Sequence, residues 1–232
     1  MLTTILSGGL IGLIFGFILQ RTRFCLTGGF RDMYIARNNT LFYAFLIAIT
    51  VESIGVLSLI QLGIIGNPYE EFSVLGAIVG SYLFGIGIVL AGGCATGTWY
   101  RAGEGLLGSW VALFFYMTSA AAMKSGFLVP LNQLIAKRWV INDDLAGQLG
   151  IPVWYLLVFL VAITSFIVIR ELRKPRRQIA TLPSKYKGVR HYLFEKTYHK
   201  YFAGFLIGLV ALIAWPASQL TGRVGGLGIT TP

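Results

Sequence analysis

The sequence has few charged residues, few histidines and only two cysteines among its 232 residues. Charged residues make up 12% of the chain and hydrophobic residues 56%, a composition that a soluble domain of this length does not need. Zinc usually takes about four ligands, and both histidines, His191 and His199, lie far along the chain from the cysteines. We therefore expect no metal site and no other cofactor. The sequence also lacks a nucleotide-binding loop, which argues against ATP hydrolysis by this chain.

Long apolar segments are the main feature of the chain. A membrane-spanning helix needs about 20 mostly apolar residues, and six segments fit that length: 3–20, 41–65, 72–93, 107–128, 152–170 and 202–220. Lipid offers the backbone no hydrogen-bond partners, so each segment is expected to be helical. The first segment has no charged region before it, so we expect it to stay in the mature protein. We predict an all-α integral membrane protein of about six transmembrane helices, with residues 1–232 forming one polytopic domain.

The positive charge of the chain is concentrated in one region. Residues 170–200 hold ten Lys and Arg against Glu171 and Glu195, which gives +8 of the total net charge of +10. The connections after the first, third and fifth segments hold fifteen Lys and Arg, against three after the second and fourth if Lys124 is included. The positive-inside rule then places the N-terminus outside and the basic loop 171–200 in the cytoplasm of a cell (inner) membrane protein.

This placement argues against nucleic-acid binding. A juxtamembrane basic loop is attracted to the anionic lipid of the bilayer. Docking of an acidic cytoplasmic partner is the alternative.

Both cysteines lie in a repeated motif. Residues 25–28 and 94–97 each read Cys-x-Thr-Gly, and an aromatic residue and an arginine follow in both copies. Each copy follows an apolar segment directly. Glycine-rich backbone at membrane depth is tolerated only where it is buried in protein or lines a cavity. We therefore predict two short re-entrant turns that line a pathway. Elsewhere, the ladder formed by Gly8, Gly12 and Gly16 is expected to serve ordinary close helix packing.

The residue types in the motif suit a small anion. Glycines beside each cysteine would let backbone N–H groups point at an anion, as in an anion nest. The arginines either gather anions or, as we expect, hold the turns by pairing with Asp32 and Glu104. The predicted pathway residues are the two cysteines, the neighbouring glycines and threonines and the two arginines: Cys25, Cys94, Gly28, Gly29, Gly93, Gly97, Thr27, Thr96, Arg31 and Arg101.

A neutral thiol is a suitable lining group for a soft, divalent sulfur anion. Such an anion loses hydration on entering a low dielectric, so the pathway must supply donors. The S–H group is a weak donor, and a free cysteine is mostly protonated at neutral pH. Binding is then favourable but weak, which permits exit. A disulfide between Cys25 and Cys94 is the alternative, although structural disulfides are rare on a reducing side of the membrane.

Glu52 lies inside the second apolar segment. An ionisable residue within the membrane is a candidate functional site. Its functional interpretation is a proton site coupled to anion entry. Its structural interpretation, which we favour, is a buried partner for an arginine, a lysine or a backbone N–H group of the cysteine turns.

The two cysteine motifs resemble those of the YeeE/YedE family of sulfur-transport membrane proteins. Residues 23–32 read Arg-Phe-Cys-Leu-Thr-Gly-Gly-Phe-Arg-Asp, and residues 90–105 read Leu-Ala-Gly-Gly-Cys-Ala-Thr-Gly-Thr-Trp-Tyr-Arg-Ala-Gly-Glu-Gly. The resemblance implies a helical fold with inward-dipping segments, along which cysteines pass thiosulfate into the cell. Cys25 and Cys94 match two of the family's pathway cysteines. The resemblance also implies a TusA-like cytoplasmic sulfurtransferase as a partner.

One departure from the family is expected to matter. The family usually has a further cysteine in a later membrane segment, whereas this sequence ends at Gly-Ile-Thr-Thr-Pro without one. We therefore expect either an incomplete family unit, a remainder supplied by another polypeptide, or a dispensable third position. The predicted function is import of thiosulfate or a related small sulfur-containing anion, by a transporter and not an enzyme. The alternatives are a membrane thiol enzyme that transfers sulfur and a non-transporting scaffold for a cytoplasmic sulfur carrier.

Overall fold

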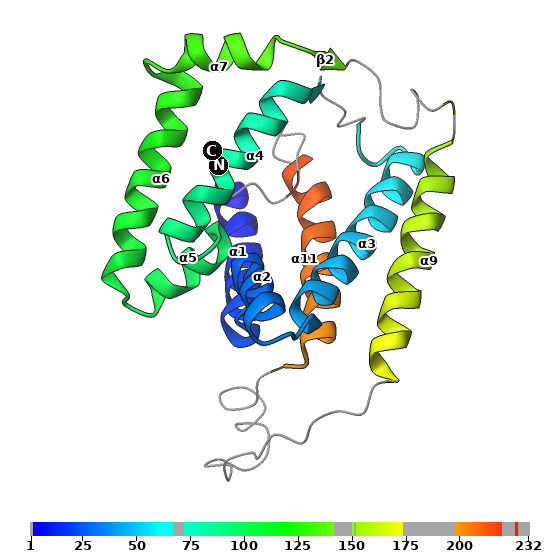
Figure 1. Cartoon of the computed structure of the whole chain (residues 1–232). Coiled ribbons are helices and arrows are strands. Elements are labelled where there is room, and N and C mark those ends of the chain that lie inside the picture. Colours follow the sequence, from blue (N-terminus) through cyan, green and yellow to red (C-terminus); the bar gives the residue numbers. More distant parts are fainter. Residues whose placement is uncertain are drawn as a thin grey trace.

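The computed structural model describes residues 2–66, 72–141, 150, 152–173, 198–219 and 226 (Figure 1). Most of the basic loop 171–200 and the C-terminal Gly-Ile-Thr-Thr-Pro lie outside the described residues. The elements, in chain order, are α1 (Leu2–Thr22), α2 (Leu26–Ile35), α3 (Thr40–Gln61), β1 (Phe72–Ser73), α4 (Val74–Leu90), α5 (Ala95–Gly103), α6 (Leu107–Ser125), α7 (Val129–Ala136), β2 (Val140–Ile141), α9 (Val153–Leu172) and α11 (Lys200–Gln219).

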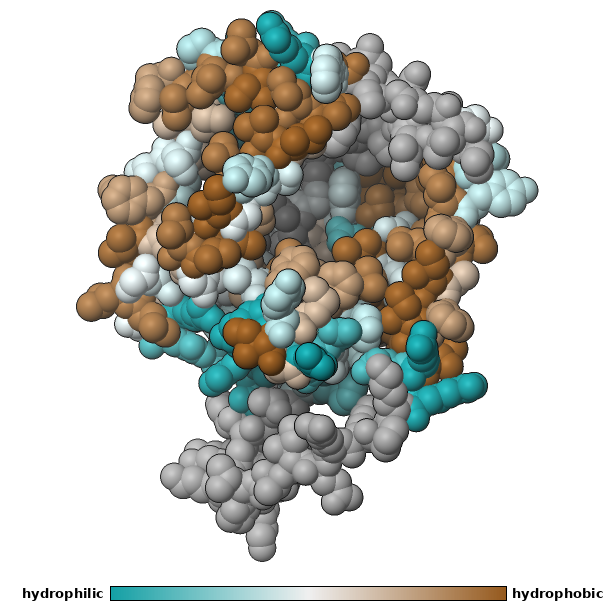
Figure 2. Space-filling view, viewed as in Figure 1, coloured by the Kyte–Doolittle hydropathy of each residue, from teal (hydrophilic) through white to brown (hydrophobic). Residues whose placement is uncertain are grey.

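The long helices confirm the prediction of an all-helical membrane protein. Five stretches are long and apolar enough to cross a membrane, and α6 with α7 makes a sixth, bent by 73°. The five stretches are Ser7–Ile35, Thr40–Gln61, Val74–Gly103, Val153–Leu172 and Lys200–Gln219. The separate short helix α7 was not expected from the sequence. Figure 2 shows hydrophobic residues over the flanks of the molecule and hydrophilic residues gathered at its lower end, as a bilayer requires.

The core forms where α1, α3 and α11 pack together. Two glycines of α11 permit the closest approach, because a side chain at Gly204 would overlap the carbonyl group of Ala44 on α3, and one at Gly208 would meet the carbonyl oxygen of Ala48 at 2.8 Å. This is small-xxx-small packing between membrane helices. The buried residues of the core are Ile18, Leu19, Phe24, Leu41, Ala44, Ala48, Ala203, Ile207 and Val210.

The glycine ladder of α1 does not mediate packing among the described residues. No described atom lies within 4 Å of a Cβ built on Gly8, Gly12 or Gly16. The expectation of close helix packing along this ladder is therefore wrong for the described part of the chain. The physical reason is that α1 meets α11 through its larger side chains, such as Ile18 and Leu19, instead.

Helix α4 differs from the core helices because none of its residues is buried. Tyr82, Leu83 and Leu90 have 71%, 62% and 83% of their surface exposed. Its first turn is fixed by Ser73, whose Oγ accepts a hydrogen bond from the Gly76 N–H at 3.1 Å and donates to the Ile135 carbonyl at 3.0 Å. The start of α4 is therefore anchored to α7, while its apolar sides remain uncovered.

Candidate functional site

Each cysteine lies in a short turn between the end of a long helix and the start of a short one. Helix α1 is followed directly by Arg23, which has a positive φ (48°), and the N–H of Phe24 donates to the Leu19 carbonyl at 3.3 Å. Helix α4 ends in the same way, with Gly92 (φ 67) and a Gly93 N–H bond to the Ile88 carbonyl at 3.1 Å. This is the hydrogen-bond pattern of a Schellman C-cap. The sequence repeat is thus also a structural repeat.

After each C-cap, the cysteine itself begins the next helix. Cys25 is the N-cap of α2 and Cys94 the N-cap of α5, both with extended backbone. The first N–H groups of a helix lack intrahelical partners and carry partial positive charge. Neither helix has an acidic residue in its first turn. Both sulfurs therefore lie at helix ends that favour an anion.

The two cysteine sulfurs are in direct contact. Cys25 Sγ and Cys94 Sγ are 3.2 Å apart, although the residues are separated by 69 positions in the sequence. Both side chains are free thiols, and 3% and 6% of their surface is exposed. The alternative of a disulfide between them is therefore not formed in this structure. The two predicted pathway turns meet at a buried pair of thiols.

The neighbours of the two sulfurs are small or weakly polar. Thr96 Oγ1 lies 3.0 Å from Cys94 Sγ. Gly97 lies against the other sulfur, because a Cβ built on it would be 2.8 Å from Cys25 Sγ. Gly28, the counterpart of Gly97 in the first turn, is less crowded, with its built Cβ 3.7 Å from the Cys25 Cβ. The thiol contact thus depends on the absence of a side chain at position 97.

The remaining motif residues flank the thiol pair without touching the sulfurs. Gly29 is buried against Leu41 of α3, and the Gly29 N–H bonds to the Cys25 carbonyl at 2.9 Å. The Thr27 hydroxyl oxygen is buried and has no hydrogen-bond partner among the described residues. Gly93 lies next to the guanidinium group of Arg101. Thr27 therefore offers an unused hydroxyl close to the first cysteine turn.

The arginines behave differently from each other. Arg31 pairs with Asp32 at 3.2 Å, as expected, in an exposed ion pair. Arg101 does not pair with Glu104. Its Nη1 donates to the Gly92 carbonyl at 2.5 Å, and Glu104 instead accepts from Gln20 Nε2 at 3.4 Å. The expected Arg101–Glu104 pair is wrong because the long Arg101 side chain reaches back past Gly93 to the Gly92 carbonyl.

Glu52 is half-buried in α3. Within the described part of the chain, no hydrogen bond or ion pair of its carboxylate is found. The favoured interpretation of Glu52 as a partner for the cysteine turns is therefore not supported by any contact among the described residues. The described residues also contain no group of three or more His, Cys, Asp or Glu side chains that could hold a metal ion.

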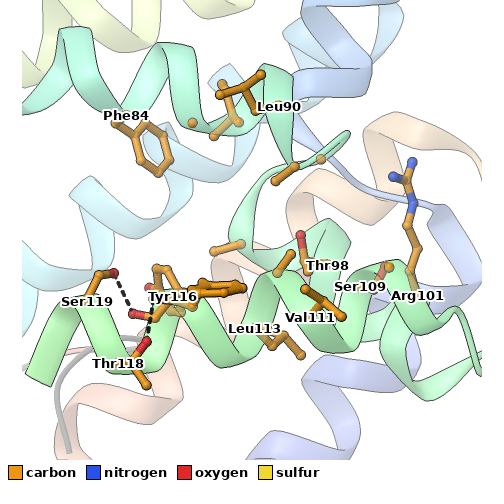
Figure 3. A pocket seen from close by; sticks show the side chains of 18 of the residues that line it. Phe84, Leu90, Thr98, Arg101, Ser109, Val111, Leu113, Tyr116, Thr118 and Ser119 are labelled. Carbon is orange, nitrogen blue, oxygen red and sulfur yellow. Dashed lines mark hydrogen bonds between the residues drawn. The ribbon is translucent and has the colours of Figure 1, made fainter.

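Sequence reasoning missed an apolar groove of about 1080 Å³ between α4, α5 and α6. Thr98 and Arg101 of α5 reach it from one side, and Tyr116, Thr118 and Ser119 of α6 from the other (Figure 3). Neither cysteine lines this groove. The groove nevertheless comes close to the thiol pair, because Gly93 and Ala95, the residues on either side of Cys94, line it.

Comparison with known proteins identifies related sequences over the whole chain. The family described as sulphur transport matches residues 21–232. The thiosulfate transporter TsuA of Escherichia coli (strain K12) is 53% identical over 232 residues, which is 100% of this chain and 66% of that protein. TsuA of Spirochaeta thermophila is 32% identical over 97% of this chain and 66% of its own length.

A shorter match is found with the probable transporter YedE of Escherichia coli (strain K12). It is 43% identical over 101 residues, which is 44% of this chain and 25% of that protein. The chain spans 66%, just under two thirds, of the length of the two TsuA proteins.

Proposed function

Because this chain belongs to the sulphur transport family, we propose that it forms a membrane pathway for thiosulfate or a related small sulfur-containing anion. The observation that carries the proposal is the buried contact between Cys25 Sγ and Cys94 Sγ at 3.2 Å. Two turns of the same local fold bring these thiols together at the starts of two helices. The printed name of the TsuA proteins, thiosulfate transporter, supports the choice of anion.

The two thiols suit a soft anion that has to be bound weakly and then released. Each thiol can donate one weak S–H hydrogen bond, and the helix starts add partial positive charge without a fixed cation. A bound cation would hold a divalent anion more tightly, whereas conduction needs binding that is weak enough for release. The thiol pair with its neighbouring threonines and glycines is therefore the narrow point of the proposed pathway.

The contacts of the two sulfurs favour transport over thiol catalysis. A catalytic cysteine is usually activated by an adjacent base such as histidine. Among the described residues, the polar side chains in contact with the sulfurs are the other thiol and the Thr96 hydroxyl. A transporter needs no such base. Repeated enzymatic sulfur transfer by this pair would therefore lack its usual activating base, whereas a single thiol–disulfide exchange needs only a thiolate.

The orientation proposed for the chain follows its basic residues. Apart from Lys124, Lys137 and Arg138, which lie near the ends of α6 and α7, several basic residues of the described part gather where α2 and α9 end and α3 and α11 begin, at the lower end of Figure 1. They include Arg31, Arg37, Arg170, Arg173 and Lys200. The positive-inside rule places this end, with the loop 171–200, in the cytoplasm and the N-terminus outside. A TusA-like sulfurtransferase that receives the anion would bind at this end.

Uptake of labelled thiosulfate into proteoliposomes tests the proposal. Uptake by the unmodified chain is expected to fall about tenfold or more in Cys94→Ala, because a thiol donor is lost at the narrow point. Cys94→Ser keeps a hydroxyl donor and is expected to retain part of the uptake. Unchanged uptake in both variants would contradict the proposed pathway. Absence of uptake by the unmodified chain would favour the scaffold interpretation.

A further inference from the structure

We propose that the Cys25–Cys94 thiol pair reacts with tetrathionate, the oxidised dimer of thiosulfate, and that the resulting disulfide locks the pathway closed. The inference rests on the proposed function, because the path proposed for thiosulfate is the route by which the related anion would reach these buried sulfurs. The proposal adds a covalent reaction at the thiol pair and a way in which that reaction would regulate transport. The reactive unit is the pair, since neither cysteine alone could form the lock.

The geometry already holds the two sulfurs almost at bonding distance. They are 3.2 Å apart, and both are free thiols. A disulfide bond is about 2.05 Å long, so closing it takes a movement of roughly 1 Å between the sulfurs. Each cysteine is the N-cap of a different helix, so the bond would join the start of α2 to the start of α5.

Gly97 is the residue that permits this approach. A Cβ at that position would be 2.8 Å from Cys25 Sγ and 3.7 Å from Cys94 Sγ. Any side chain there would push the Cys25 sulfur away from its partner. Gly103, in the same helix, has no described atom within 4 Å of its built Cβ. The two glycines of α5 therefore form a matched pair for testing the contact.

The first step is attack by one thiol on a central sulfur of tetrathionate. Cys94 is suited to it, because Thr96 Oγ1 lies 3.0 Å from its sulfur and can donate a hydrogen bond to the thiolate. The Cys94 proton goes to water, and a Cys94–sulfur bond forms as the central sulfur–sulfur bond of tetrathionate breaks. One thiosulfate leaves with the electron pair of that bond, and the second thiosulfate remains attached to Cys94.

The second step is attack by Cys25 on the sulfur of Cys94. The Cys25 proton is lost, the Cys25–Cys94 disulfide forms, and the second thiosulfate leaves with the electron pair of the broken bond. In total, two thiols are oxidised by two electrons, one tetrathionate is reduced to two thiosulfates, and two protons are released. The distance of 3.2 Å between the two sulfurs places Cys25 within reach of the Cys94 sulfur for this attack.

The disulfide would close the pathway for two reasons. The sulfurs touch in this structure, so an anion can pass between them only if the starts of α2 and α5 move apart. A covalent bond prevents that separation. It also removes both S–H donors that the anion would meet. A dithiol reductant would reverse the reaction and restore the path.

The test treats the chain in proteoliposomes with tetrathionate and measures three quantities. We expect release of two thiosulfates per chain, a Cys25–Cys94 cross-link in peptides analysed by mass spectrometry, and a loss of thiosulfate uptake of about tenfold or more. Dithiothreitol should restore uptake and both thiols. In Cys25→Ser, one thiosulfate should be released and the adduct should remain on Cys94.

The glycine pair supplies the control. Gly97→Ala should slow cross-linking about tenfold, because the Cys25 sulfur is displaced, whereas Gly103→Ala should cross-link at the unmodified rate. Unreacted thiols after treatment would overturn the proposal, and so would a stable adduct on one cysteine of the unmodified chain. Uptake before treatment reports on the proposed function by itself. A chain that transports but does not cross-link, or cross-links but does not transport, would show which of the two ideas fails.

Discussion

The two cysteine turns have the same backbone design but are held in place in different ways. The first turn is packed into the core, where Phe24 has 2% of its surface exposed and stacks on Phe45 with ring centroids 4.5 Å apart. The second turn follows α4, which has no buried residue. The turn itself buries Cys94, Thr98 and Ala102. Two polar bonds also hold it, from Arg101 to the Gly92 carbonyl and from the Thr98 hydroxyl to the Cys94 carbonyl.

This difference indicates which turn can move. Core packing is dense and resists small displacements, whereas the helix before the second turn has no buried residue and the exposed Arg101–Gly92 hydrogen bond is worth only about 1 kcal/mol. If the two sulfurs have to separate for an anion to pass, the second turn is the one expected to shift.

Replacing an aromatic residue should destabilise the first turn much more than the second. Phe24→Ala removes a buried ring and is expected to lower the free energy of unfolding by about 3 kcal/mol or more. Trp99→Ala, in the second turn, removes a ring with 43% of its surface exposed and should lower it by less than about 1 kcal/mol. Thermal unfolding in detergent measures both. Equal losses would show that the second turn is also held by packing.

Adding a methyl group to the motif glycines should impair the second turn more than the first. Gly97→Ala forces a carbon against Cys25 Sγ and should cost about 2 kcal/mol at the thiol pair, which would lower thiosulfate uptake by about tenfold or more. Gly28→Ala makes only ordinary contacts, 3.7 Å from the Cys25 Cβ and 3.8 Å from Leu41. It should change uptake by less than about twofold. Similar uptake in both variants would contradict the asymmetric crowding of the sulfurs.

Removing the arginine charge should affect only the second turn. Arg101→Gln loses the charged donor to the Gly92 carbonyl, a change of about 1 kcal/mol, and should speed alkylation of Cys94 by N-ethylmaleimide about fivefold. Arg31→Gln breaks an exposed ion pair and should change the rate by less than about twofold. The side chain of Arg31 is 64% exposed. An unchanged rate in Arg101→Gln would mean that this bond does not hold the turn.

The threonine pair should give small effects of opposite sign. Thr27→Val removes a buried hydroxyl that has no partner and should raise the free energy of unfolding by about 0.5 kcal/mol. Thr96→Val removes the hydroxyl beside Cys94 Sγ and should lower it by about 0.5 kcal/mol. Thermal unfolding of the two variants measures the difference. If Thr27→Val also lowers thiosulfate uptake, the free hydroxyl of Thr27 serves the anion.

Much of the architecture could be predicted from the sequence because the signals are local. Apolar run length located the membrane helices, and the Cys-x-Thr-Gly repeat located two turns of the same structure. Glycine content was a weaker guide. The ladder at Gly8, Gly12 and Gly16 lies open among the described residues, whereas Gly204 carries the closest helix contact. Glycine spacing along one helix does not reveal which face meets a neighbour.

The helical membrane class and the two cysteine turns could be predicted from the sequence, because hydropathy and backbone conformation depend on residues close together in the chain. Only the tertiary structure decided that Cys25 and Cys94 touch, since they are 69 positions apart and packing of α1 against α5 brings them together. It also decided the partner of Arg101 and the crowding at Gly97. Those features depend on how α5 packs against α1 and on where its side chains reach, which residue spacing does not specify.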